Sequence, residues 1–272
     1  MIVSLQGPID IDGFRRAARQ LLTRGIAPDQ LVWRTESGTQ GLWADDAVVI
    51  DDAPAKPFSV PAWMAPLCES ALLHRDPDRF HLLYRLLWRL VSECDEVLRR
   101  DELDPDRRAA AQLAREVGRE IHKMRAFVRF FPHGEGEALR HIAWFEPEHH
   151  VVEANAPFFV RRFAQMRWAI FTPGCSIEWD GERLHTGPGV DRSGLPPADP
   201  GAGLWLTYYE NIFNPARLKL AMMTKEMPRR YWKNLPEAAL IAPLSAAAQA
   251  RSEAMVEAQP TPARRIKPMR RP

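Results

Sequence analysis

Residues 120–173 constrain the fold more than any other part of this sequence, because their residue types recur with a readable period. Near the start of this stretch, Arg125, Phe127, Arg129 and Phe131 occupy every second position. A period of two is typical of a β-strand, since successive side chains point to opposite faces. The segment is therefore predicted to be a strand with one basic and aromatic face.

The rest of this stretch, and the residues just after it, predict further strands around one helix. Proline favours the turn of a first hairpin, and Asp-Gly between alternating runs favours a second. The predicted elements are a hairpin of 139–145 with 149–152 turning at Pro147, a helix over about 154–166, a strand over 168–172, and a hairpin of 176–179 with 183–185 around Asp180-Gly181.

The first half of the chain predicts a small lobe followed by helices. Alternating short strands around a helix that Asp10 or Asp12 would cap suggest an α/β lobe. Asp76-Pro77 and Asp104-Pro105 each place a capping residue before a proline, which predicts two helix starts. The predicted organisation is an α/β lobe over 1–52, a proline-rich linker over 53–60, a helical plus β-sheet core domain over 61–244, and a disordered basic tail over 245–272. The expected fold class is therefore α+β, with a helical middle and a mixed or antiparallel sheet flanked by helices.

Composition places the chain among soluble proteins of a reducing compartment, so a cytoplasmic location is expected. No apolar run approaches the roughly 18 residues that span a bilayer, and the first residues lack the features of a secretory signal. The three cysteines are few and far apart, which argues against a disulfide framework. The charge is uneven: residues 215–272 hold twelve Lys/Arg and four Asp/Glu, although the whole chain carries only +2. Such a basic segment suggests a polyanionic partner, although a solubilising tail would have the same composition.

The densest group of ionisable residues surrounds His149 and His150. No phosphate-binding loop, dinucleotide fingerprint or serine-hydrolase elbow is present, so catalysis would fall to histidine and carboxylate side chains. The candidate catalytic residues are His122, Glu148, His149, His150 and Asn155. The alternatives are histidines that satisfy core hydrogen bonds and an Asn155 that caps a helix. A metal site of His141, His149 and Glu153 is a further alternative, but its spacing is not diagnostic, and no metal or cofactor is assigned.

Arginine interleaved with aromatic residues suits nucleic acid, because guanidinium groups bind phosphate and rings stack on bases. The alternative is a sheet whose phenylalanines pack inward beneath long arginine stems. The candidate nucleic-acid-binding residues are Arg125, Phe127, Arg129, Arg161, Arg162, Arg229, Arg230, Trp232 and Lys233.

Several long segments resemble a known bacterial family. They are LLYRLLWRL, HKMRAFVRF, AWFEPEHHVVEANAPFFVRRFAQMRWAIFTP, IFNPARLK and EMPRRYWKNLPEA. The family comprises proteins assigned to DNA metabolism or DNA repair. It is a domain of unknown function, found alone or ahead of a uracil-DNA-glycosylase-like domain, and associated with a radical-SAM DNA-repair protein. The resemblance extends to about residue 244 and implies a role linked to DNA, but it supplies no catalytic residues.

Three functions remain open from the sequence. The first is a DNA-repair component that binds damaged or single-stranded DNA and works with the radical-SAM protein, with a uracil-DNA-glycosylase-like protein as a further partner. The second is an enzyme that processes nucleic acid with the His/Glu cluster. The third is a protein–protein adaptor that does not touch DNA.

Overall fold

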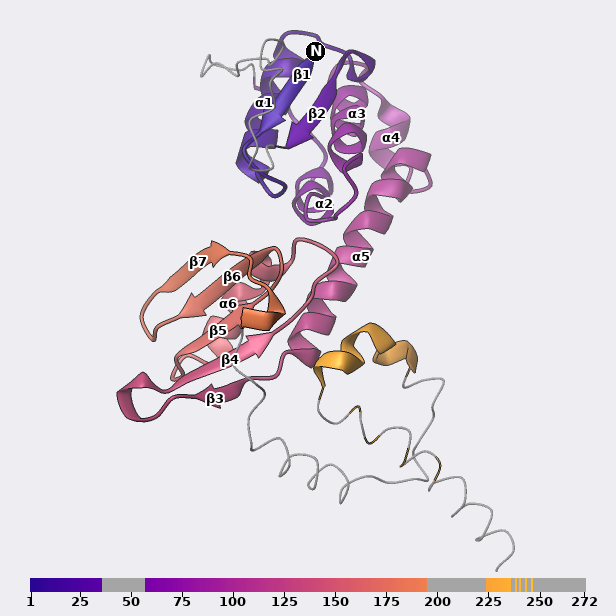
Figure 1. Cartoon of the computed structure of the whole chain (residues 1–272). Helices are drawn as coiled ribbons and strands as arrows, with labels where there is room; N and C mark the ends of the chain where they lie inside the picture. Colours follow the sequence, from indigo (N-terminus) through magenta and orange to yellow (C-terminus); the bar gives the residue numbers. More distant parts are fainter. Residues whose placement is uncertain are drawn as a thin grey trace, which may run out of the picture. The chain divides into compact units, whose positions relative to one another are not determined.

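A computed structural model of the chain describes residues 1–35, 57–194 and 224–235, with four isolated positions between 238 and 246 (Figure 1). The chain divides into two compact units, 1–196 and 197–272. The elements of the first unit are β1 (Ile2–Leu5), α1 (Ile11–Thr23), η1 (Pro28–Gln30), β2 (Val32–Thr35), α2 (Met64–Ala71), α3 (Arg79–Val91), α4 (Glu96–Arg100), α5 (Pro105–Phe127), β3 (Phe131–His133), η3 (Gly136–Ala138), β4 (Arg140–Trp144), α6 (Val152–Arg162), β5 (Trp168–Phe171), β6 (Cys175–Trp179), β7 (Leu184–Pro188) and η4 (Arg192–Gly194). The second unit contributes η6 (Arg229–Asn234). Helices and mixed sheets together confirm the α+β class.

The N-terminal elements form as predicted. The Asp10 side chain accepts the Gly13 N–H and caps α1, and Gly25 follows the helix with a φ of +69° that favours glycine. Strands β1 and β2 pair in parallel, with Ile2 opposite Val32. They share one hydrophobic core with α1, α2 and α3, so residues on both sides of the predicted linker pack together.

Helix α3 is buried on most sides, as its nearly continuous apolar sequence predicts. Leu83, Leu86 and Leu90 are fully buried. Its polar side makes ionic contacts, among them that of Arg89, whose guanidinium bonds the carboxylates of Asp95 and Asp104. Those aspartates are themselves helix caps, so one arginine ties α3 to the starts of α4 and α5.

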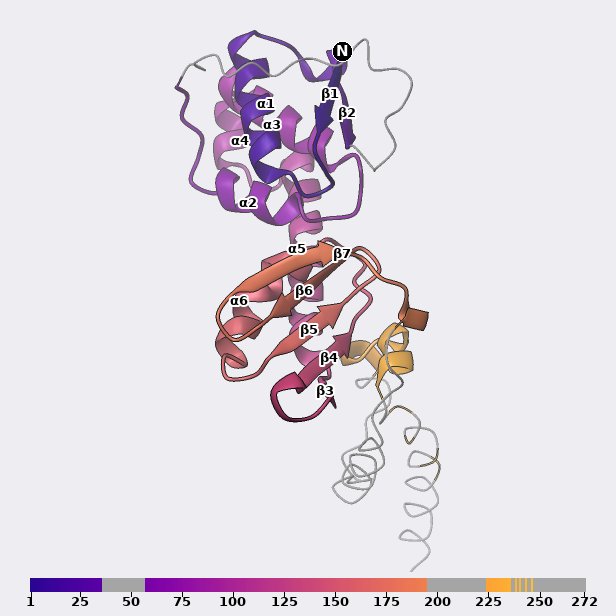
Figure 2. The ribbon, with the colours of Figure 1, turned by 60° about the vertical axis from the view of Figure 1, so that its left-hand side comes forward.

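The second sheet has the strand order β3-β4-β5-β6-β7. Strands β4 and β5 pair in parallel and all other neighbours are antiparallel, which makes the sheet mixed. Helix α6 packs on one face, where Phe159 meets Trp168 edge-on with ring centroids 6.1 Å apart. Figure 2 shows α5 and α6 behind this sheet. The predicted helix, the strand after it and the Asp-Gly hairpin are all present.

The strand predicted over 125–131 is wrong. Arg125 and Phe127 lie in the last turn of α5, and the strand starts only at Phe131. The helix continues because Val117, Glu120 and Met124 keep its buried face at spacings of three and four. Tertiary packing on that face overrides the local alternation of arginine and phenylalanine.

The strand predicted over 149–152 is also wrong. Strand β4 already has β3 on one side and β5 on the other, so no edge is left for a hairpin partner. The segment instead turns and enters α6 at Val152. Residues 36–52 of the predicted α/β lobe, half of the predicted linker (53–56) and the basic tail beyond 246 lie outside the described residues. No helix in the described part of the chain is long and apolar enough to cross a bilayer.

Candidate functional site

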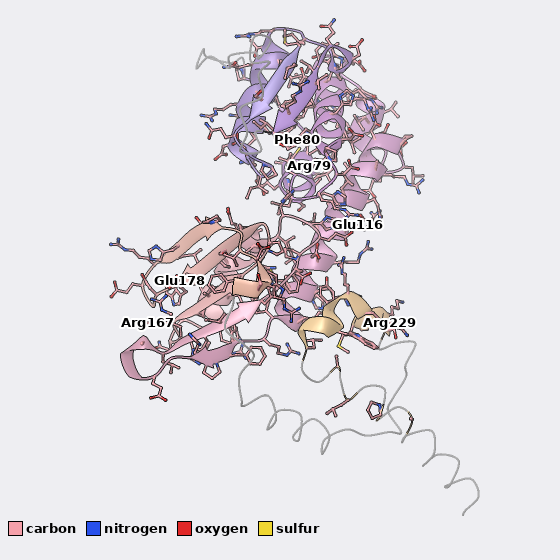
Figure 3. The ribbon with its side chains drawn as sticks, viewed as in Figure 1. Arg79, Phe80, Glu116, Arg167, Glu178 and Arg229 are labelled. Carbon is pink, nitrogen blue, oxygen red and sulfur yellow. The ribbon has the colours of Figure 1, made fainter. Side chains whose placement is uncertain are left out.

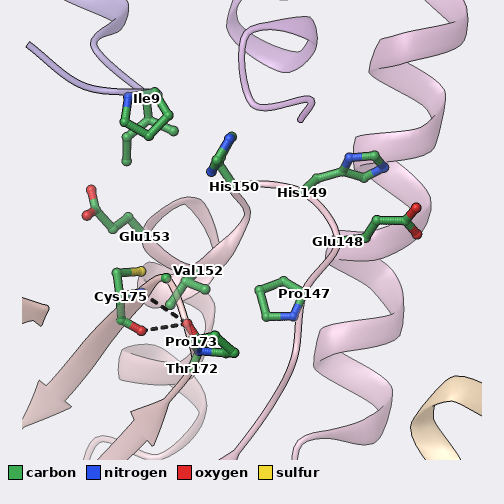
Figure 4. A pocket seen from close by; sticks show the side chains of 12 residues that line it. Ile9, Pro147, Glu148, His149, His150, Val152, Glu153, Thr172, Pro173 and Cys175 are labelled. Carbon is green, nitrogen blue, oxygen red and sulfur yellow. Dashed lines mark hydrogen bonds between the residues drawn. The ribbon is translucent and has the colours of Figure 1, made fainter. Parts of the chain in front are cut away.

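A pocket of about 260 Å³ lies where the segment between β4 and α6 meets the turn between β5 and β6 (Figure 4). The N-terminal loop contributes one apolar wall. Its lining residues are Pro8, Ile9, Pro147, Glu148, His149, His150, Val152, Glu153, Thr172, Pro173, Gly174 and Cys175. Three of the five candidate catalytic residues therefore meet at one pocket.

The segment that carries these histidines is held from beneath by α5. The buried Glu120 carboxylate accepts the backbone N–H of Glu148 at 2.9 Å and that of His149 at 2.7 Å. The backbone N–H of His150 donates to the Leu73 carbonyl at 2.9 Å. The backbone amides of residues 148–150 have no partner in a sheet, and these three bonds satisfy them. The bonds thereby hold the backbone that carries the two histidine side chains.

His149 is buried against a second histidine that the sequence analysis missed. Its ring lies 4.2 Å from the ring of His74, centroid to centroid. Its Nδ1 accepts the Arg75 N–H at 3.4 Å, and its Nε2 lies 4.0 Å from the Glu120 carboxylate. Burial, and then the proximity of His74, lower the pKa of His149 to about 4. The ring is therefore neutral at pH 7, and each ring nitrogen already faces a protein group, which favours a structural role.

His74 extends this network to α5. Its Nε2 lies 3.0 Å from Oε2 of Glu116, and its Nδ1 accepts the Asp76 N–H at 3.0 Å. Glu116 projects from the middle of α5 (Figure 3), and hydrogen bonds from Gln112 and then His74 hold its pKa below the ordinary value. Glu116 and Glu120 are four residues apart on a helix, so their shared face was a signal available in the sequence.

His150 differs from its neighbour in that no hydrogen bond to its ring is found within the described residues. Burial, followed by the charges of Arg79 and His74, lowers the pKa of His150, so the imidazole in the pocket is neutral. The exposed Glu153 and the Cys175 thiol line the same pocket. Burial and then Glu153 raise the pKa of Cys175, which makes it a poor nucleophile. Of the pocket's side chains, His150 is thus the one best suited to acid–base chemistry.

The remaining two candidate catalytic residues lie elsewhere. His122 is exposed on α5 and does not line the pocket. Asn155 is completely buried in α6, where its Oδ1 accepts Nε of Arg125 at 2.7 Å and its Nδ2 donates to the Ile121 carbonyl at 3.3 Å. Val151 holds the capping position of α6, so neither the pocket role nor the cap expected for Asn155 matches its place.

Arg125, Phe127 and Arg129 do not share the strand face that was predicted for them, because the first two lie in α5. Arg125 is exposed but lies over the Phe158 ring at 4.7 Å, and Arg129 donates to the carbonyls of Ala126 and Val128. Phe127 is half-buried beside Lys123. The others are distributed as follows: Arg161 and Arg162 are exposed at the end of α6, while Arg229, Arg230, Trp232 and Lys233 fall in η6 of the second unit.

One group of side chains among the described residues has the composition and spacing of a metal site. It consists of His74, Glu116 and His149, whose ligand atoms all lie within 4.8 Å of one another. The set considered from sequence, His141 with His149 and Glu153, is not among such groups.

Comparison with known proteins identifies a family. The profile of DUF4130, a domain of unknown function, matches residues 77–237, which is more than half of the chain. No curated protein and no solved structure matches the chain.

Proposed function

This chain belongs to the DUF4130 family, and we propose that it binds DNA through the outward face of α5. The observation that carries this proposal is the separation of charge on that helix. Arg108, Arg115 and Arg119 are exposed at spacings of seven and four residues, and His122 follows on the same side. From Arg108 to His122 this row is about 21 Å long at the helical rise of 1.5 Å per residue.

The acidic residues of α5 turn the other way. Asp106 accepts two hydrogen bonds from Arg85 at 3.0 and 2.6 Å, Glu116 meets His74, and Glu120 holds the segment before α6. The charges of Asp106 and Glu120 therefore lie on the inner side of the helix, while Glu116 lies at its margin, where Arg119 also comes within 3.7 Å of its carboxylate. The solvent side is left basic, which is the electrostatic footprint of a phosphate-binding surface.

The form of this surface favours contacts with the DNA backbone over base stacking. A stacking platform needs open aromatic faces, and Phe127 is half-buried at the end of the helix. Long arginine side chains on one helix face suit a row of phosphates instead, because each guanidinium donates in a fork. We therefore propose sequence-independent binding, to which Arg229 and Arg230 of the basic C-terminal unit add.

The role of this binding follows from the family resemblance described above. We propose that the chain holds damaged DNA for a radical-SAM DNA-repair protein, and that a uracil-DNA-glycosylase-like protein is a second candidate partner. Binding to such a partner without any binding to DNA would instead support the adaptor function.

A second candidate function is supported by the pocket. The neutral imidazole of His150 and the exposed carboxylate of Glu153 line the same pocket, and both groups are suited to proton transfer on a component of nucleic acid. In that case His150→Gln abolishes activity in a complementation assay while the melting temperature stays nearly unchanged. Full complementation by His150→Gln rejects the enzymatic function and leaves the binding function standing.

The test of binding uses fluorescence anisotropy with labelled duplex and single-stranded DNA. The triple variant Arg108→Ala, Arg115→Ala, Arg119→Ala is expected to weaken duplex binding at least tenfold. The matched control replaces the exposed Arg16, Arg19 and Arg24 of α1 and its C-cap, which removes the same charge at another place. Equal losses in the two triple variants would show that only net charge matters, and no loss in the first would reject the α5 surface.

A further inference from the structure

We propose that His74, Glu116 and His149 bind one divalent transition-metal ion. The three side chains come from separate parts of the chain: the turn after α2, the middle of α5, and the segment between β4 and α6. Two of them, His74 and His149, are buried, whereas the Glu116 side chain is about one-third exposed. Such convergence of two imidazoles and a carboxylate is a common transition-metal ligand set.

The distances are close to those that an ion would require. Nε2 of His74 and Oε2 of Glu116 are 3.0 Å apart, and the three ligand atoms lie within 4.8 Å of one another. An ion at about 2.0–2.2 Å from each atom holds its ligands roughly 3–4.4 Å apart, which is close to the separations seen here. Oε2 of Glu120 lies 4.0 Å from Nε2 of His149, but it accepts the His149 backbone N–H and does not belong to this group of three.

The protonation states also suit a cation. A metal ligand must be a neutral imidazole or an ionised carboxylate. The pKa of His149 is lowered to about 4 by burial and then by His74, and the pKa of Glu116 lies below its ordinary value. At pH 7 the imidazole of His149 is therefore neutral and the carboxylate of Glu116 is negatively charged, which are the charge states that a metal ligand needs.

Binding has a structural consequence that makes it observable. Each Nδ1 accepts a backbone N–H, from Asp76 for His74 and from Arg75 for His149, so the ring protons sit on Nε2. An ion at Nε2 moves each proton to Nδ1, where it faces that backbone donor. The turn of residues 74–76 must then shift, and the two hydrogen bonds must break.

The donor atoms define the class of ion. Imidazole nitrogen with carboxylate oxygen suits Zn²⁺, Mn²⁺, Fe²⁺ and Co²⁺, whereas Mg²⁺ and Ca²⁺ prefer oxygen alone. The Glu116 side chain is about one-third exposed, so an ion can reach the site from solvent. The outward face of α5 takes no part, so this proposal and the DNA-binding proposal stand or fall separately.

The test is calorimetric titration of the chelator-treated full chain with Zn²⁺ and, separately, Mn²⁺. One high-affinity site is expected for Zn²⁺, and Glu116→Gln is expected to weaken it at least tenfold. The control His185→Gln alters an exposed histidine that pairs with Asp180 and is expected to leave the site intact. Unchanged binding in Glu116→Gln, or its loss in His185→Gln, overturns the proposal.

A second measurement does not depend on the folding of a variant. In amide NMR spectra of the unmodified chain, one equivalent of Zn²⁺ is expected to shift the Arg75 and Asp76 amides. Amides around the distant Asp180 turn are expected to stay in place. Zinc binding without shifts at residues 74–76 overturns the assignment to His74 and His149.

Discussion

The carboxylate of Glu120 accepts the backbone N–H of His149 at 2.7 Å, and its other oxygen accepts the preceding N–H. One buried side chain of α5 thus serves two amides of the segment that carries the pocket histidines. Bonds to a charged acceptor are roughly twice as strong as neutral ones. Helix α5 therefore positions the pocket from its inner face while its outer face stays basic.

The first prediction concerns this carboxylate. In Glu120→Gln the side-chain –NH₂ faces one of the two backbone donors, the N–H of Glu148 or that of His149. That buried N–H then has no acceptor. The free energy of unfolding is expected to fall by about 2–3 kcal/mol, measured by urea denaturation. The exposed Glu153→Gln serves as the control and is expected to change stability by less than about 0.5 kcal/mol. Equal stability of the two variants would show that Glu120 does not hold the segment.

The second prediction concerns pH. The pKa of His149 lies at about 4 in the folded chain, below its ordinary value of 6.5, because of burial and then His74. The unfolded chain therefore binds more protons between these values, and stability falls as pH falls from about 6.5 to 4. The loss approaches about 3 kcal/mol at the lower end.

His149→Gln isolates this contribution. The variant is expected to be less stable at pH 7, but its stability should fall less steeply between pH 6.5 and 4.5, a range above the lowered pKa of Glu116. The measurement is urea denaturation at several pH values. Parallel pH profiles for the two proteins would contradict a neutral, buried His149.

The third prediction concerns the contact between α5 and α6. Asn155→Ala removes the partner of Arg125 Nε and is expected to destabilise the fold by about 1–3 kcal/mol. Arg125→Ala is expected to cost less, because Arg125 is exposed. In the double variant the two losses of stability should not add, because each substitution removes the same hydrogen bond between Arg125 and Asn155. Full additivity would show that the pair is not coupled.

Local sequence signals predicted most of the elements but not their junctions. Asp104-Pro105 predicted the start of α5 correctly, because a capping residue and a proline at the first helical position depend only on neighbouring residues of the same turn. The end of α5 depends on the buried contacts of Met124 with segments distant in the sequence. The alternation of arginine and phenylalanine therefore predicted a strand where the helix continues. Similarly, the partner of β4 is β5 across α6, a pairing that no local pattern specifies.

The site shows the same limit. The sequence brought Glu148, His149 and His150 together because they are adjacent, and they do share a pocket. His74 and Glu116 are separated from them by about 75 and 33 positions, so only the fold shows that they meet His149. The catalytic roles of Glu148, His149 and His150 stay predictions.

The measurement that tests the central claim most directly is the salt dependence of duplex DNA binding. Each phosphate contact releases counterions, so log Kd plotted against log salt has a slope of about 0.9 per contact. Replacing Arg108, Arg115 and Arg119 by alanine should weaken binding and flatten this slope by about 2–3 units, whereas the α1 control triple variant should keep it. An unchanged slope and affinity in the α5 variant would contradict DNA binding through this face.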